Sequence, residues 1–261
     1  MTTMPLQGPQ QTGWRRHHEW LCLARLLPNA LTLGNLALGS AALGVALGGA
    51  VDARSAPLIV LSLLAGALAC DLLDGRAARA FHSANAFGVE LDSLADVVSF
   101  GLAPAAVLWS WKLDRAGALG LCGVAAIVLA AATRLARFNV TALLAPTDGA
   151  PATRSVGLPV TIPAAIALGA ATSDLAVSPR AVAIGAVVLG ALMVSRLGYR
   201  TFKRRSLVVI VLPALLAMGL GVLALGEPGP GIGLGLFALG TAYALSAPLS
   251  ALRRAGQARS R

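Results

Sequence analysis

Charged side chains are scarce in this sequence: only 12% of its 261 residues are charged, whereas 57% are hydrophobic. A soluble globular domain usually carries about 25% charged residues, and the mean hydropathy here is +0.76. The composition therefore excludes an ordinary soluble domain and indicates an integral membrane protein. Aromatic residues are few as well, at 5%. Ala, Leu, Gly and Val supply most of the apolar content, and such small residues allow transmembrane helices to approach closely.

Cysteine is almost absent. Cys22, Cys70 and Cys122 are far apart and lie in apolar stretches. Their number and spacing indicate neither a disulfide framework nor a cysteine metal site, so we interpret all three as small packing residues.

Long apolar runs make up most of the chain. They predict an all-α integral membrane protein, a polytopic bundle of about eight transmembrane helices. A spanning helix needs about 20 residues, and the runs from Leu158 and Arg180 are shorter, so six or seven spans are the alternative. The eight runs are 28–50, 57–75, 88–111, 116–143, 158–172, 180–196, 207–225 and 231–249.

The two ends of the chain differ from this apolar body. Residues 1–27 predict a disordered polar tail and then an N-terminal interfacial helix, because residues 14–27 combine arginines, histidines and tryptophans. Residues 28–205 form the expected catalytic bundle, 206–250 two additional packing helices, and 251–261 a basic cytoplasmic tail.

The net charge of +10 has a membrane explanation. The basic residues cluster between apolar runs, so we expect no nucleic acid partner. With eight spans, 17 of the 21 Lys and Arg residues fall on one side, and the positive-inside rule makes that side cytoplasmic. Both termini are then cytoplasmic, and anionic lipid headgroups are expected partners.

Four aspartates lie at the facing ends of the second and third runs: Asp71, Asp74, Asp92 and Asp96. Spacings of three and four residues place each pair on one helix face. Carboxylates at membrane depth are costly, and four directed at one place repel one another unless cations lie between them. Hard oxygen ligands favour Mg²⁺ or Mn²⁺, and the quartet predicts a cytoplasmic-facing site for two such ions.

Small and basic residues surround these carboxylates. Gly75 and Gly88 remove side chains where a ligand or a helix must come close, and Ala78 keeps the face of Asp74 shallow. Arg79 can bind phosphate oxygens with its guanidinium. The alternative is a set of carboxylates paired with Arg76 and Arg79 that share no ligand.

The whole pattern, D71-x2-D74-G75-x2-A78-R79-x8-G88-x3-D92-x3-D96, resembles the signature of the CDP-alcohol phosphotransferase family. The resemblance implies an enzyme in which an alcohol displaces CMP from a CDP-linked lipid, with a divalent metal. It implies that Asp71, Asp74 and Asp92 are metal ligands. It also implies that Asp96 completes the metal site and acts as general base on the attacking hydroxyl.

Further stretches narrow the acceptor alcohol. Residues 28–39 (PNALTLGNLALG), 136–140 (ARFNV), 155–165 (SVGLPVTIPAA) and 192–204 (LMVSRLGYRTFKR) resemble membrane-embedded bacterial phosphatidylserine synthases. This resemblance implies CDP-diacylglycerol and L-serine as substrates, and a bacterial inner membrane as location. Glycines in the last runs invite close helix contact, so we expect a homodimer.

Polar residues beside the motif are candidate contacts for the CDP-lipid. Asn29 and Thr32 are three residues apart near the cytoplasmic face, where they can hydrogen-bond the cytidine or its ribose. A helix N-cap is the alternative for Asn29. Asn85 lies in the motif loop, where it can touch the nucleotide or stabilise the turn.

Arginines of the fourth run are candidate contacts for serine. Arg134 and Arg137 share a helix face and have Asn139 nearby, and a serine carboxylate needs a cation such as a guanidinium. The alternatives are binding of a lipid phosphate and charge pairing with the aspartates.

Two other functions stay open at this point. One is a sibling transferase that uses another alcohol, such as glycerol phosphate or inositol phosphate. The other is a metal-ion transporter, because intramembrane carboxylates also mark ion pathways.

Overall fold

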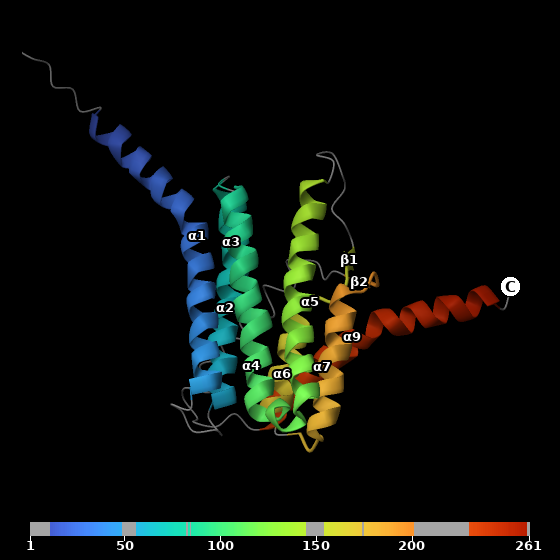
Figure 1. Cartoon of the computed structure of the whole chain (residues 1–261). Helices are drawn as coiled ribbons and strands as arrows, with labels where there is room; N and C mark the ends of the chain where they lie inside the picture. Colours follow the sequence, from blue (N-terminus) through green and yellow to red (C-terminus); the bar gives the residue numbers. More distant parts are fainter. Residues whose placement is uncertain are drawn as a thin grey trace, which may run out of the picture.

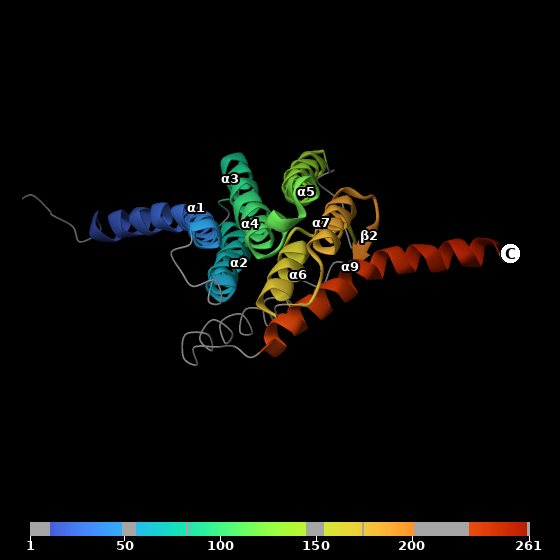
Figure 2. The same cartoon turned by 60° about the horizontal axis from the view of Figure 1, so that its bottom comes forward.

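The computed structural model describes residues 11–48, 56–81, 83, 85–144, 154–173, 175–200 and 230–259. This part of the chain is a bundle of helices (Figures 1 and 2). The predicted span at 207–225 and the predicted disordered tail before residue 11 lie outside the described residues.

The helices follow the apolar runs. Their bounds are α1 (Gln11–Gly48), α2 (Ala56–Ala80), α3 (Ala86–Asp96), the π-helix η1 (Val97–Leu102), α4 (Ala103–Trp111), the 3₁₀-helix η2 (Leu113–Ala116), α5 (Ala118–Leu143), α6 (Thr161–Thr172), α7 (Pro179–Val194) and α9 (Pro230–Arg259). The two strands are β1 (Arg154–Val156) and β2 (Gly198–Arg200).

Five helical stretches of the described chain are long and apolar enough to cross a membrane: Leu26–Gly48, Leu58–Ala80, Ala86–Trp111, Ala118–Thr141 and Gly231–Ala251. Large apolar side chains on their outer faces are exposed, as expected where a bilayer replaces water. The all-α membrane architecture is thus confirmed. The two shorter helices, α6 and α7, match the two short predicted runs, and a total of eight spans stays a prediction.

The first helix is longer than predicted. A span was expected to begin at Pro28, but α1 runs continuously from Gln11 to Gly48 with Pro28 inside it. Proline cannot donate a backbone hydrogen bond to the preceding turn, and Figure 1 shows the N-terminal part of α1 inclined away from the bundle. Placement of that part at the membrane interface stays a prediction.

From α1 to α5, successive spans run in opposite directions, with α3, η1 and α4 forming one span, so their connections alternate between the two ends of the bundle (Figure 1). The α2–α3 turn, the end of α5 and the β-strands lie at one end. The turn after α4, which carries Lys112 and Arg115, lies at the other. The two motif helices are therefore antiparallel, as predicted, and each of them packs mainly against α1 rather than against the other.

A small antiparallel ribbon of β1 and β2 was not predicted. Ser155 pairs with Tyr199 and Val156 with Gly198. Gly157 follows β1 with a φ of 82°, a conformation that L side chains rarely adopt. A Cβ there would also lie 2.9 Å from Nη2 of Arg137. The residue that follows β1 is thus packed directly against the backbone of Met193 on α7 and the side chain of Arg137 on α5.

The third span contains a π-helical segment immediately after Asp96. The N–H of Ala103 donates to the carbonyl of Val98, five residues earlier. Pro104 follows and has no N–H to continue the α-helical pattern. Ser99, in this segment, donates from its hydroxyl to the backbone carbonyl of Asn35 at 3.1 Å, which ties the segment to α1.

The buried core lies between these helices. Its largest members include Leu64, Phe100, Leu135 and Met193, contributed by four different elements. Cys70 and Cys122 are free thiols.

Candidate active site

The carboxylates of Asp71, Asp74 and Asp92 come together between α2 and α3. One oxygen from each lies within 4.8 Å of the others. Asp74 is buried at 5% exposure, and the other two are half-buried. α2 continues to Ala80, so Asp74 lies within its last two turns and Asp71 just before them.

This donor set fits a divalent cation. Three carboxylates so close together repel one another, and oxygen-only ligands suit Mg²⁺ and Mn²⁺. Asp96, one turn beyond Asp92 on α3, lies outside the group of three. It interacts electrostatically with Asp71 and Asp92, so it borders the group that the other three form.

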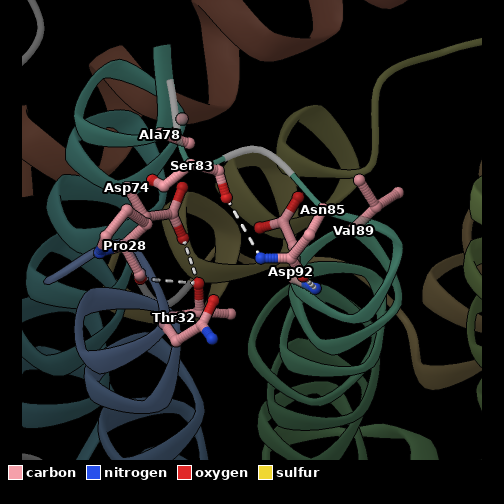
Figure 3. Close-up of a pocket in the computed structure, with 11 residues that line it drawn as sticks. Pro28, Thr32, Asp74, Ala78, Ser83, Asn85, Val89 and Asp92 are labelled. Atoms are coloured by element: carbon pink, nitrogen blue, oxygen red, sulfur yellow. Dashed lines mark hydrogen bonds between the residues drawn. The ribbon is translucent and has the colours of Figure 1, made fainter. Parts of the chain in front are cut away.

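A pocket opens beside these carboxylates (Figure 3). Six of the seven predicted CDP-lipid contacts line it, and Arg79, exposed on the last turn of α2, does not. The lining residues are Pro28, Asn29, Thr32, Asp74, Gly75, Ala78, Ser83, Asn85, Gly88, Val89 and Asp92. Helices α1, α2 and α3 thus all contribute to one pocket that reaches the carboxylates.

Thr32 links α1 to the carboxylate group. Its buried hydroxyl lies 2.7 Å from Oδ2 of Asp74 and 3.0 Å from the carbonyl oxygen of Pro28, and both bonds are drawn in Figure 3. A hydroxyl has one proton, so it donates to one of these oxygens at a time. Thr32 therefore orients a carboxylate, which was not part of the prediction for it.

Two asparagines and a glycine shape the other side of the pocket. Asn85 is the N-cap of α3, because its Oδ1 accepts from the N–H of Gly88 at 2.8 Å. A Cβ on Gly88 would lie 3.2 Å from Oδ1 of Asn29, so glycine permits this close approach. The N-cap alternative for Asn29 is wrong, because α1 passes through it uninterrupted.

Asn35 was missed by the sequence analysis. It is fully buried in α1, and its Nδ2 donates to Oδ1 of Asp96 at 3.2 Å. Its own Oδ1 is buried and has no hydrogen-bond partner among the described residues. The sequence does contain one indication of this role. Asn35 is a polar residue in an apolar span, and it lies three residues after Thr32, on the same helix face.

The predicted serine contacts on α5 occupy three different settings. Arg134 is half-buried and interacts electrostatically with Asp96. Arg137 donates to the carbonyl oxygens of Val194 at 2.9 Å and Val156 at 3.3 Å, so it fastens α7 and β1 to α5. Asn139 donates from Nδ2 to Oγ of Ser93 on α3 at 2.9 Å. Of these three residues, Arg134 is the one whose charge is known to interact with Asp96.

Comparison with known proteins adds the family. Residues 25–195 match the family described as CDP-alcohol phosphatidyltransferase. The chain belongs to this family. It is therefore a phosphatidyltransferase, and the intramembrane carboxylates are those of an enzyme family rather than of an ion transporter.

Several relatives carry one and the same name, CDP-diacylglycerol–serine O-phosphatidyltransferase. A Helicobacter pylori protein is 32% identical over 187 residues, which cover 69% of this chain and 73% of that protein. A Bacillus subtilis protein is 29% identical over 69% of this chain and 93% of its own length. A Saccharomyces cerevisiae protein is 41% identical over 39% of this chain and 37% of its own length.

Proposed function

We propose that this phosphatidyltransferase moves the phosphatidyl group of CDP-diacylglycerol to L-serine, giving phosphatidylserine and CMP. The observation that carries the proposal is the pocket of α1, α2 and α3, which joins six predicted CDP-lipid residues to Asp74 and Asp92, two of the three gathered carboxylates. The shared name of the relatives supports serine as the acceptor.

The proposed reaction is an alcohol displacement at phosphorus. The serine hydroxyl oxygen forms a bond to the phosphorus that carries the diacylglycerol. The bond from that phosphorus to the bridging oxygen breaks, and the electron pair leaves with CMP. Asp96 accepts the hydroxyl proton, since a weak nucleophile needs a base within reach.

The metal ligands in this proposal are Asp71, Asp74 and Asp92, with Asp96 completing a site for two Mg²⁺ or Mn²⁺ ions. When bound, such ions supply positive charge that offsets the charge of a diphosphate. Thr32 holds the carboxylate of Asp74 in place, and Asn35 does so for Asp96. Both α1 side chains thus prepare the ligands before any substrate binds.

Arg134 is the proposed partner of the serine carboxylate. Its charge interacts with that of Asp96, which supports binding of the serine carboxylate on the side of the pocket that holds the base. Serine contacts of Arg137 and Asn139 stay predictions, since their side chains already bond to the ribbon, α7 and α3. The site faces the cytoplasm in this proposal, because the basic residues gather at its end of the bundle.

The test is CMP release by the purified chain with CDP-diacylglycerol, Mg²⁺ or Mn²⁺, and one alcohol at a time. We expect L-serine to support release, with phosphatidylserine as lipid product. Glycerol phosphate and inositol phosphate are the sibling acceptors to compare. Release with one of them and none with serine would replace the acceptor while leaving the phosphatidyl transfer intact.

A further inference from the structure

The four carboxylates lie at two depths, and the register between α1 and α2 shows which residues of α1 accompany each depth. The hydroxyl of Thr32 lies 2.7 Å from Oδ2 of Asp74, so these two residues are level. Because the two helices are antiparallel (Figure 1), a step forward along α1 corresponds to a step back along α2. Asn35, three residues after Thr32, is therefore level with Asp71, about one turn deeper in the bundle.

Contacts on both sides of Asn35 agree with this register. A Cβ on Gly34 would lie 3.3 Å from Sγ of Cys70. These two residues directly precede Asn35 and Asp71 in the sequence. Toward α3, Nδ2 of Asn35 donates to Oδ1 of Asp96 at 3.2 Å. Asn35 thus lies at the depth of Asp71 and Asp96, whereas the pocket is lined by the two shallower carboxylates.

The amide of Asn35 carries an acceptor that no described residue satisfies. The residue is 0% exposed, and its Oδ1 is buried without a hydrogen bond to any part of the chain that the structure describes. Asp96 sets the orientation of the amide, because a carboxylate accepts from Nδ2 and repels Oδ1. A buried acceptor without a partner destabilises the folded state, so this oxygen indicates a ligand that completes it.

The neighbours of this oxygen favour a cation as that ligand. The two polar atoms of an amide are about 2.3 Å apart, so Oδ1 of Asn35 lies no further than about 5.5 Å from Oδ1 of Asp96. The acidic groups at this depth, Asp71 and Asp96, accept hydrogen bonds when ionised and have no proton to donate. A divalent cation offsets their mutual repulsion, and carbonyl oxygens are ordinary ligands of hard cations.

We propose that Oδ1 of Asn35 is an oxygen ligand of the cation at the depth of Asp71 and Asp96. The inference rests on the proposed two-cation site and goes beyond it, because it assigns a ligand on α1, outside the aspartate pattern of α2 and α3. One amide then has two roles, since Nδ2 orients Asp96 while Oδ1 binds the cation. Helix α1 is therefore part of the metal centre as well as a wall of the nucleotide pocket.

The first test measures Mn²⁺ binding to the purified full chain in detergent, without either substrate. Asn35→Leu removes both polar atoms of the amide and keeps a side chain of similar size. We expect the Kd of a bound Mn²⁺ to rise about 10- to 100-fold, the range for losing a group that supports a metal site. An unchanged Mn²⁺ Kd in Asn35→Leu would overturn the inference.

Asn35→Cys separates a ligand from a residue that only orients Asp96. A thiolate is a soft ligand, so a cysteine at a ligand position should shift the preference from Mn²⁺ toward Cd²⁺ by about tenfold or more. A thiolate–Cd²⁺ charge-transfer band should appear in the ultraviolet. Leu38→Cys is the matched control, because Leu38 lies three residues further along α1 and packs against the apolar core. The unchanged chain gives the baseline for the native thiols, including Cys70.

A Cd²⁺ preference in Asn35→Cys no greater than in Leu38→Cys would contradict a ligand role. Asn35→Asp decides the question if the cysteine variant does not fold. A carboxylate at a ligand position should bind Mn²⁺ at least as tightly as the unchanged chain does, and a loss as large as in Asn35→Leu would overturn the inference.

These measurements need no turnover, so they stand apart from the phosphatidyl transfer. A chain that binds Mn²⁺ through Asn35 but releases no CMP with any alcohol would keep the inference and lose the proposed function. Conversely, CMP release with serine together with Mn²⁺ binding that no Asn35 variant alters would keep the function and lose the inference.

Discussion

At the scale of single residues, the site is a concentration of negative charge with a few donors at its edge. The oxygens of Asp71, Asp74 and Asp92 lie within 4.8 Å of one another, while Thr32 donates to one of these carboxylates. Holding like charges this close destabilises the folded state. Bound cations would offset this loss of folding stability. Substituting one carboxylate at a time therefore tests what each of them does.

Replacing Asp96 by Asn should abolish phosphatidyl transfer while leaving the protein inserted in the membrane. An amide cannot accept the hydroxyl proton, and loss of a general base lowers rates by about 10²- to 10⁴-fold. The measurement is kcat for CMP release, with insertion followed by membrane fractionation. Glu90→Gln is the matched control, because Glu90 is exposed on the same helix. Wild-type kcat in Asp96→Asn would remove Asp96 from the base role.

Replacing Asn35 by Ala should lower kcat more than it raises either KM. Its amide bonds to Oδ1 of Asp96, and losing a hydrogen bond to a charged group costs about 1.5–3 kcal/mol. We expect a fall in kcat of about 10- to 100-fold. Ser99→Ala is the comparison, because it removes only the bond to the backbone carbonyl of Asn35. Equal kcat losses in both variants would point to packing of α1 instead of placement of Asp96.

The sequence predicted which residues line the site better than it predicted the hydrogen bonds that those residues form. Five of the pocket residues were expected because they belong to one continuous pattern of glycine, alanine and carboxylate: Asp74, Gly75, Ala78, Gly88 and Asp92. Asn35 was not, because its contact with Asp96 spans 61 positions and no local spacing reveals it. Arg137 shows the converse: its type suggested an anion ligand, but its donors are used by backbone carbonyls of α7 and β1.

At the scale of elements, the hydropathy of the sequence predicted the positions of the helices well. It gave no indication of the segments with irregular backbone. The apolar runs coincide with α2, α5, α6 and α7 to within a few residues. The ribbon of β1 and β2 pairs two three-residue segments more than 40 positions apart, too short for any period-2 signal. The π-helical η1 likewise leaves the apolar pattern unchanged, so nothing in the sequence separated it from α-helix.

Replacing Gly39 by Ala should destabilise the junction of α1 and η1. A Cβ there would overlap Oγ of Ser99 and lie 2.8 Å from its Cα, so backbone must move. Overpacking of this kind costs about 1–3 kcal/mol. Gly44→Ala is the matched control on the same helix, because a Cβ at Gly44 has nothing within 4 Å. Thermal unfolding in detergent should give a lower melting temperature for Gly39→Ala than for Gly44→Ala, and equal values would contradict the close packing.

At the scale of the whole molecule, the α2–α3 turn, the ends of α5 and α7 and the ribbon lie toward one end of the bundle (Figure 1), and the carboxylate group lies between α2 and α3 near that turn. The core beneath them is apolar, so the end that holds the charge has a rigid support. Binding of cations at this end is therefore expected to act on the stability of the entire bundle, since the carboxylates join α2 to α3 across the turn between them.

Mg²⁺ or Mn²⁺ should raise the melting temperature of the purified chain, and excess EDTA should lower it again. A ligand that binds only the folded state stabilises it by about 2.7 kcal/mol at 100 times its Kd. Na⁺ at matched ionic strength controls for general screening. Asp92→Asn removes one ligand and part of the repulsion within the group. That variant should therefore melt higher than the unchanged chain in EDTA yet gain less from Mg²⁺. A gain in Asp92→Asn as large as in the unchanged chain would place the cation elsewhere, because the lost carboxylate would then contribute nothing to binding.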